Sequence, residues 1–463
     1  MNKKVFAYLM IFLSSAFIIS SCKVTQKYQP PSISAAGLYR DSVSSDTNSI
    51  ANLHWNQVFT DAALQSLITE GITKNLNIQI AYTRIQQAEA YYSQSRAAFL
   101  PTLNANAQVT ESKLSAVQGF GIRNSATQYQ LGLSSSWEVN VWGRLSSARR
   151  ASLASLMQSE AAARAVQTGM VASIANYYYS LLALDRQLAI TEETVKNWDT
   201  TVTTMRALKE AAIVTGAAVV QSEASRYAAE VTIPDLKQNI REIENALSIL
   251  LSRPSGSISR SNIDDQIPIT LLQTGVPAQL LSNRPDVQEA EYNFRYSFEQ
   301  TNIARTYFYP SLTITGSGGL SSLSLRTFFN SASVFGSIAA GLTEPIFNGR
   351  ANRTRLEAAR AQQQEALLSF QSTLLTAGQE VSDAMSLYQT ALDKMTVRTN
   401  QLNALQKSVE YSRELLRYGS ANYIEVIQAR QSLLGAELNR INDHLQQLLA
   451  IVDLYRALGG GWK

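Results

Sequence analysis

Few side chains in this sequence could carry out bond-making chemistry. The 463 residues contain two histidines, His54 and His444, and one cysteine, Cys22. The histidines lie in different sequence neighbourhoods, so the sequence indicates neither a charge-relay pair nor a multi-histidine metal site. A single thiol excludes an internal disulfide framework and a cysteine-based zinc site. These counts point away from an enzyme and predict no resident metal.

The single cysteine lies at the end of a targeting segment. A basic start precedes an apolar run, 5–19, which has signal-peptide length and is too short to span a bilayer comfortably. The run ends in Ile-Ser-Ser followed by Cys22, which resembles a bacterial lipobox. We therefore expect 1–21 to be a lipoprotein signal peptide and Cys22 to carry diacylglycerol and palmitate, with no other cofactor. Lys23 stands where an aspartate would resemble an inner-membrane retention signal, which favours the outer membrane.

The composition indicates a folded protein and no surface for binding nucleic acid. Hydrophobic residues make up 45% of the chain, which is enough to bury a core. The 40 basic and 36 acidic residues form no block of like charge, so no nucleic-acid partner is expected. Beyond Cys22 no apolar run approaches about 18 residues, the length of a transmembrane helix. Any membrane-spanning segment would have to be a β-strand.

Three landmarks recur in the same order and indicate an internal duplication. The matching pairs are 95–103 with 304–312, Trp142-Gly143-Arg144 with Asn348-Gly349-Arg350, and Gly216 with Gly419. Each arginine of the second pair lies six residues after a glutamate. The offsets are 209, 206 and 203 residues, so order and spacing are nearly kept. The sequence therefore predicts two halves of similar structure.

Each half is predicted to contain a β-hairpin. In the first half, apolar and polar residues alternate over about 102–114 and 127–141, as in strands with one apolar face. The second half predicts strands at about 311–323 and 333–346, the last from the repeat more than from its own alternation. Each first-half strand is long enough to cross a bilayer.

A long helical hairpin is predicted after each β-hairpin, at 145–252 and 350–457. Apolar residues follow heptad seams. The seams are Ile174, Tyr177, Leu181, Leu184, Leu188, Val195, Trp198, Val202 and Met205, and then Ile424, Ile427, Leu434, Leu438, Ile441, Leu445, Leu448, Val452 and Tyr455. Seventy helical residues would measure on the order of 105 Å, too long for a compact domain. Gly216 and Gly419 are expected at the hairpin tips, in a left-handed conformation.

The predicted organisation has five parts. They are the signal peptide 1–21, a lipid-anchored linker 22–55, a first repeat 56–255, an inter-repeat linker 256–283 and a second repeat 284–463. Within the second repeat, Asp286 is expected to cap a helix that starts at Val287.

Four half-polar strands cannot close a barrel by themselves, and lipid does not tolerate open sheet edges. Strands from several copies must therefore share one barrel. Two copies would give eight strands with a filled interior, whereas three would give twelve and leave a lumen. We expect a mainly α fold with a transmembrane β part, in which a homotrimer forms a 12-stranded outer-membrane β-barrel that continues into a periplasmic α-barrel.

The mature chain resembles the outer-membrane factor lipoproteins of tripartite efflux pumps, the TolC-like, OprM-like and NodT group. The motifs that carry the resemblance are SWEVNVWGR at 136–144, LSNRPDV at 281–287, FYPSL at 308–312, EPIFNG at 344–349 and LYRALGGGW at 454–462. The resemblance implies an exit duct that performs no chemistry and conducts drugs, toxic compounds or metal ions. The implied partners are a periplasmic adaptor and an inner-membrane transporter of the resistance-nodulation-division class.

The resemblance also implies a periplasmic aperture closed by side chains just after the second hairpin tip. The matching positions are Ile424, Glu425 and Gln428. Three copies of Glu425 would form an acidic ring, although Gln428 replaces an aspartate of the family, so a second ring is not expected. Glu425 could instead be an ordinary solvated position, and Ile424 fits the heptad seam as well as the aperture. The tips, 212–220 and 415–423, are the expected adaptor contacts.

Three alternatives remain open on sequence alone. A lipid-anchored periplasmic coiled coil would leave the paired alternating hairpins unexplained. A surface hydrolase would need a nucleophile and a base, and the two histidines offer no such pair. Within the conduit class, the chain could be the outer-membrane component of a type I protein or peptide secretion system.

Overall fold

The computed structural model describes residues 24–31, 37–40, 49–113, 125–268, 279–418 and 423–463. Cys22 and Gly419 lie outside these ranges. The chain divides into two compact units. The first unit comprises Met1–Ser32, Arg84–Ser159 and Ala290–Phe370, and the second comprises Ile33–Thr83, Glu160–Glu289 and Gln371–Lys463.

Helices dominate the fold. The α-helices are α2 (Trp55–Val58), α3 (Ala62–Lys74), α4 (Leu76–Ala97), α5 (Arg144–Glu210), α6 (Gly216–Glu230), α7 (Thr232–Leu250), α8 (Leu280–Asn283), α9 (Pro285–Thr306), α10 (Ala351–Arg417) and α11 (Tyr423–Ala457). The strands are β1 (Thr102–Lys113), β2 (Ser125–Val139), β3 (Ser311–Ser322) and β4 (Val334–Thr343). Short 3-10 helices lie at Ile50–Asn52, Ile263–Asp265, Leu325–Thr327 and Ser331–Ser333.

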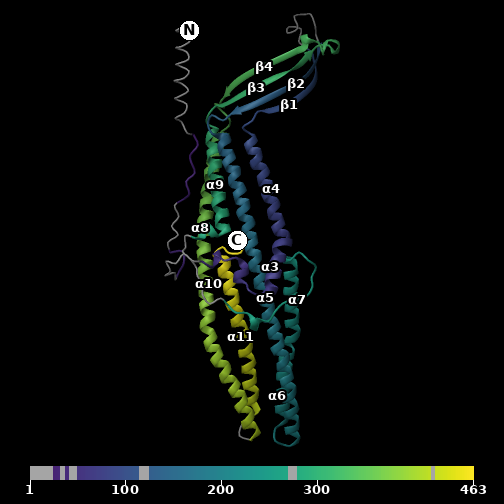
Figure 1. Cartoon of the computed structure of the whole chain (residues 1–463), viewed down its shortest axis with the longest axis vertical. Helices are drawn as coiled ribbons and strands as arrows, with labels where there is room; N and C mark the ends of the chain where they lie inside the picture. The colour runs from purple at the N-terminus through teal and green to yellow at the C-terminus, as the bar shows by residue number, and fades with distance from the viewer. Residues whose placement is uncertain (1–23, 32–36, 41–48, 114–124, 269–278, 419–422) are drawn as a thin grey trace. The chain divides into compact units, whose positions relative to one another are not determined.

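The first unit contains a four-stranded antiparallel sheet in the order β1-β2-β3-β4 (Figure 1). The two hairpins come from the two halves of the chain, and β2 of the first half pairs with β3 of the second. This order leaves β1 and β4 as the two edges of the sheet. Observed strand bounds differ from the predicted bounds by at most three residues at either end.

Two very long helices follow the hairpins. α5 and α10 each contain 67 residues, and Gly169 and Gly378 interrupt neither helix. In the second unit α6 turns back along α5, and α11 turns back along α10 (Figure 1). Seam positions of α5 are buried where the heptad pattern predicts it, as at Ile174, Leu181 and Trp198, whereas Tyr177 is exposed.

Two helix starts differ from the sequence prediction. The chain after the α5–α6 turn forms two helices, α6 and α7, separated at Val231. Helix α6 does not continue because Pro234, in the first turn of α7, has no N–H to donate to it. α9 starts at Pro285, two residues before the predicted Val287. Asp286 therefore lies inside the first turn, where its carboxylate pairs with Arg284 at 2.6 Å and accepts from the N–H of Val287 at 3.0 Å.

The C-terminal Gly-Gly-Gly-Trp segment closes against the loop before α9, within the second unit. Gly459 has φ +87°, and a Cβ at this position would lie 2.5 Å from the carbonyl oxygen of Asn283. The indole of Trp462 donates to the same carbonyl at 3.0 Å. Arg284 donates to the carbonyl of Ala457 at 2.9 Å and to Glu380 at 2.7 Å. Two motifs that are 170 residues apart in sequence thus form one contact.

Candidate functional site

One face of the sheet is apolar from edge to edge. The cross-strand rows on this face include Leu131–Leu320–Val334, Trp137–Ile314–Ala340 and Val139–Leu312–Leu342, with Leu103, Ala105, Ala107 and Val109 along β1. Among the residues that the structure describes, no helix covers these side chains: Val109 is 67% exposed and Ile338 is 88% exposed. An exposed apolar sheet face of this extent is suited to lipid rather than to water.

The opposite face carries hydroxyl and amide groups. Asn106 donates to Ser134 at 2.7 Å, and Gln128 donates to Ser321 at 2.9 Å. Ser317 and Ser337 share a hydrogen bond of 2.8 Å. These side-chain bonds link all four strands across one polar face, which is compatible with a water-filled space.

Glycines at the centre of the polar face allow the strands to approach closely. A Cβ added to Gly319 would overlap the backbone of Leu131 and Gly132. The ring of Phe335, opposite Gly319 in the register, lies 3.4 Å from a Cβ position on Gly132. Phe335 therefore covers the glycine pair and occupies the space that side chains would otherwise fill.

Aromatic and charged side chains gather where the strands meet the helices in the first unit. Arg144, at the start of α5, forms an ion pair with Glu138 of β2. The indole of Trp142 stacks on Tyr309 at 5.0 Å between ring centroids and donates to the carbonyl of Pro310 at 2.7 Å. The second half does not repeat this pair, because Arg350 binds Glu357 instead of a glutamate six residues earlier.

The turn between α5 and α6 corrects one prediction. Gly216 lies next to this turn, but it is the first residue of α6 and its φ is not positive. The left-handed residue is Ala212, with φ 58°. The N–H of Ile213 bonds to the carbonyl of Leu208, and the N–H of Ala212 bonds to that of Lys209. These are the two bonds of a Schellman motif, in which the chain reverses at Ala212 and not at the glycine.

The predicted aperture residues lie on one exposed side of the first turns of α11. Ile424 is 48% exposed, and Glu425 and Gln428 are also exposed. Val426 and Ile427 face the interior, and Ile427 packs with Trp198 and Ala229. Tyr423 also packs against this cluster, so the hydrophobic seam begins in the first turn of α11, and Glu425 and Gln428 lie outside it.

Polar contacts attach α11 to the α5–α6 hairpin close to these residues. Arg430 donates to the carbonyl of Asn197 at 3.1 Å, and Gln431 donates to Ser225 at 3.1 Å. Burial lowers the pKa of Arg430, and the nearby Arg413 lowers it further. Packing and these two hydrogen bonds thus hold the first turns of α11, while burial and Arg413 oppose the charge on Arg430.

A half-buried polar cluster lies around Asp61 in the second unit. Tyr178 donates to Asp61 at 2.7 Å and Gln266 donates to it at 2.8 Å, with Ser261 completing the set. Burial alone would raise the pKa of Asp61, but these hydrogen bonds to the carboxylate hold it below its usual value. The cluster joins α3, α5 and the inter-repeat linker, so its role is structural.

Neither histidine belongs to a reactive arrangement. His54 is the N-cap of α2 and accepts from the N–H of Asn56. Burial lowers the pKa of His444, which lies near Asp264 and Arg440. Over the ranges that the structure describes, no three His, Cys, Asp or Glu side chains are grouped to hold a metal ion. No helix among the described residues has both the length and the apolar content needed to cross a membrane.

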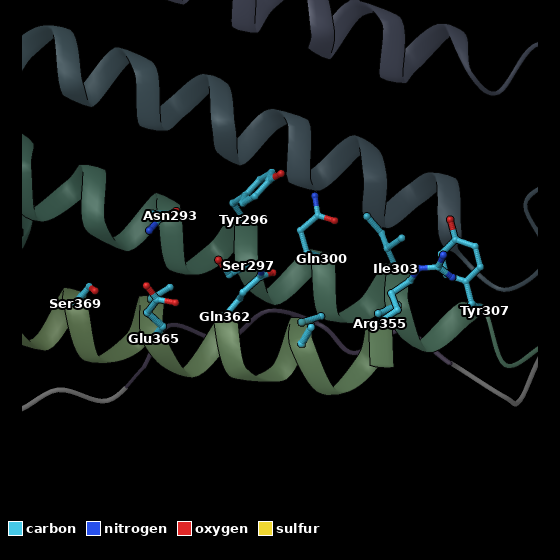
Figure 2. Close-up of a pocket in the computed structure, with 14 residues that line it drawn as sticks. Asn293, Tyr296, Ser297, Gln300, Ile303, Tyr307, Arg355, Gln362, Glu365 and Ser369 are labelled. Carbon is cyan, nitrogen blue, oxygen red and sulfur yellow. The ribbon is translucent and has the colours of Figure 1, made fainter. Parts of the chain in front are cut away.

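A groove lies between α9 and α10 in the first unit, with a volume of about 690 Å³ (Figure 2). Tyr296, Gln300 and Tyr307 line it from α9, and Arg355 and Glu365 line it from α10. Arg355 extends toward Tyr307, with its guanidinium 3.9 Å from the ring centroid. The sequence analysis did not predict this groove, because its residues form no motif and meet only when the two helices pack.

The family model described as outer membrane efflux protein matches residues 67–253 and 276–460. The chain belongs to this family. The family model matches the chain in two separate segments.

The similarity to curated relatives covers nearly the full length. The chain is 28% identical to the cation efflux system protein CusC of Escherichia coli O6:H1, over 97% of each chain. It is also 28% identical to the antibiotic efflux pump outer membrane protein ArpC of Pseudomonas putida, over 98% of this chain and 96% of that protein. A solved structure of CusC, described in connection with transmembrane channel formation, matches with a TM-score of 0.85 at 26% identity, covering 95% of this chain and 100% of that chain.

These findings confirm the family resemblance stated from the motifs. The protein is an outer-membrane efflux protein, a passive conduit and not an enzyme. The two curated relatives are named for efflux, which supports the efflux interpretation over a type I secretion component.

Proposed function

We propose that three copies of the chain close one twelve-stranded barrel in the outer membrane and form the exit duct of a tripartite efflux system. The two-faced sheet with open edges carries this proposal. β1 and β4 would pair between neighbouring copies, because unpaired strand edges are too costly in lipid. With four strands per copy, two copies would give a filled eight-stranded barrel, whereas three give twelve strands and leave a lumen.

The two faces of the sheet have separate roles in this arrangement. The apolar face, with Leu133, Val109 and Ile338, would contact lipid acyl chains. The polar face, with Asn106, Ser134 and Ser317, would line the duct with neutral hydrogen-bonding groups. A neutral polar lining lets solutes of different charge pass without tight binding, as a general export route requires.

The helical part of each copy would continue the duct as a periplasmic α-barrel. The two hairpin tips, 212–220 and 415–423, are the proposed contacts for a periplasmic adaptor, which joins the duct to an inner-membrane transporter of the resistance-nodulation-division class. Lipid on Cys22 would anchor the N-terminal linker in the outer membrane. The exported compounds are proposed to be toxic small molecules or metal ions, since relatives of equal identity are named for cation and for antibiotic efflux.

Ile424, Glu425 and Gln428 are the proposed aperture. Their shared exposed side on α11 supports this role. In a trimer, three Glu425 carboxylates around one axis would attract cations and repel one another.

Single-channel recording in planar bilayers tests the aperture. Wild-type protein should give small conductance steps, and Glu425→Ala should enlarge them by several-fold because the ring loses its side chains. Glu410→Ala, at an exposed glutamate of α10 away from the aperture, is the matched control and should behave as wild type. An unchanged conductance for Glu425→Ala would remove this residue from the aperture.

A further inference from the structure

The groove between α9 and α10, called here the α9–α10 groove, lies on one side of α9. On the other face of α9, the ring of Tyr28 packs on Phe298 and Phe294 at 5.5 and 6.0 Å between centroids. Gln26 exchanges two hydrogen bonds with Asn302, of 3.0 and 2.9 Å. Residues 294, 298 and 302 share one helix face, so residues 24–31 cover that face.

Groove residues lie on the opposite side of the helix. At 100° per residue, Tyr296 is about 200° around α9 from Phe294, and Gln300 is about 240° around. If the proposed function holds, lipid on Cys22 lies in the membrane outside the barrel, so the segment that follows it runs along the outer surface. The face that carries Tyr28 is then the outside, and the α9–α10 groove opens toward the duct.

Two contacts fix the register of α9 against α10. Thr301 donates to the carbonyl of Ala359 at 3.1 Å, and Asn352 donates to the carbonyl of Tyr307 at 2.6 Å. Because the helices are antiparallel, this register brings Tyr296 level with Glu365. Figure 2 shows Glu365 pointing from α10 toward α9, with Tyr296 on the facing helix.

The charges of the groove are not equivalent. The guanidinium of Arg355 lies 3.9 Å from the ring centroid of Tyr307 and donates to Asn352 at 3.2 Å, which holds this cation at the Tyr307 end of the groove. Glu365 is exposed and forms no ion pair with any residue that the structure describes. Asn293, Gln300 and Gln362 add amide groups to the lining of the groove, and Ile303 with four alanines adds apolar surface.

We propose that the α9–α10 groove is a weak binding site for amphiphilic organic cations in transit through the duct. Glu365 supplies the counter-charge and the ring of Tyr296 supplies a surface on which an aromatic or alkyl body packs. The volume suits one drug-sized molecule per copy. This inference rests on the proposed function, because only the assembled duct delivers such cations to the groove.

Dye binding tests the proposal on the full-length protein reconstituted in phosphatidylcholine nanodiscs. The probe is ethidium, a planar cation whose fluorescence rises on binding. Glu365→Gln should weaken the affinity by about two- to fivefold, since one exposed charge contact is lost while the size and shape of the side chain stay. Tyr296→Leu should also weaken it. Glu410→Gln, which removes a carboxylate from α10 away from the groove, should leave the affinity at the wild-type value.

Two results would overturn the groove site: equal affinity for Glu365→Gln and wild type, or an equal loss for Glu365→Gln and Glu410→Gln. Planar-bilayer conductance of the same samples separates this failure from a failure of the duct. Channels with unaltered dye binding in Glu365→Gln would leave the duct standing without the groove site. Absence of channels in wild type would remove the proposed function first.

Discussion

Ala212 holds the position where a helix of this length normally reverses at a glycine. Its φ of 58° places the Cβ in a left-handed conformation that costs about 1 kcal/mol for a residue other than glycine. Ala212→Gly should therefore raise the unfolding midpoint of the detergent-solubilised protein. Relief of the left-handed conformation adds about 1 kcal/mol to the free energy of unfolding, and the larger entropy of glycine in the unfolded chain offsets part of this gain.

Ala224→Gly is the matched control for this change. Ala224 is exposed in the middle of α6, where glycine should lower the stability by about 0.5–1 kcal/mol. Opposite signs for the two substitutions are expected. A loss of stability for Ala212→Gly comparable to that of the control would mean that the turn is not left-handed at this residue.

Glu437 gives a pH-dependent contribution to stability. Burial raises its pKa and the nearby Glu193 raises it further, while Arg440 and Arg186 act in the other direction. Because the folded-state pKa is above the unfolded value, this group stabilises the fold fully below the unfolded pKa and loses that contribution as pH rises through the folded pKa.

Glu437→Gln should therefore be more stable than wild type at pH 7–8, by less than about 1 kcal/mol because the site is half exposed. The difference should vanish near pH 4, where the wild-type carboxyl is protonated. Thermal unfolding across this range measures it, with Glu89→Gln on the exposed side of α4 as the control. A difference that persists unchanged at pH 4 would contradict the charge origin.

At two positions the structure differs from what the local sequence pattern predicts. The heptad pattern placed both Ile424 and Ile427 in the seam, but of the two only Ile427 is buried. Near its end, a helix packs against the hairpin core on one side only. Gly216 was assigned the reversal because glycine favours it, whereas the backbone reverses at Ala212, four residues earlier. Local propensity located the turn and did not identify its left-handed residue.

At the scale of elements, strand prediction succeeded where alternation was strict. β1 alternates strictly over 102–110, because one face there is exposed and apolar and the other is polar, whereas Glu111 and Lys113 break the pattern at its end. β4 alternates poorly since Phe335 and Ala339 occupy polar-face positions, and Gly336 and Ala340 occupy apolar-face positions. The cause is three-dimensional: Phe335 covers the glycines of β2 and β3, a pairing that β4 alone cannot reveal.

The glycine contact in the sheet predicts a position-specific effect. Gly319→Ala should disrupt the β2–β3 pairing, because the new Cβ overlaps the backbone of Leu131 and Gly132. Gly341→Ala in β4 is the control, since no atom lies within 4 Å of its Cβ position. Heat-resistant assembly on a denaturing gel should be lost for Gly319→Ala, at a cost of at least about 1–3 kcal/mol, and kept for Gly341→Ala. Equal behaviour of the two variants would argue against this sheet register.

For the whole molecule, three recurring landmarks predicted a duplication. The family was predicted from short motifs, and the structure shows what two of these motifs contact. The LSNRPD and Gly-Gly-Gly-Trp motifs contact each other through Asn283, Gly459 and Trp462, which is why both are so specific. The α9–α10 groove could not be predicted, because its lining comes from two helices whose register is set by packing at Thr301 and Asn352.

Electron microscopy of the detergent-extracted protein tests the central claim, that three chains share one barrel and form a duct. The expected result is a particle with three-fold symmetry in which β4 of each copy pairs with β1 of the next, giving twelve strands around an open lumen. A monomer, or an assembly in which the four-stranded sheet keeps its two edges unpaired, would contradict the shared barrel and with it the exit-duct mechanism.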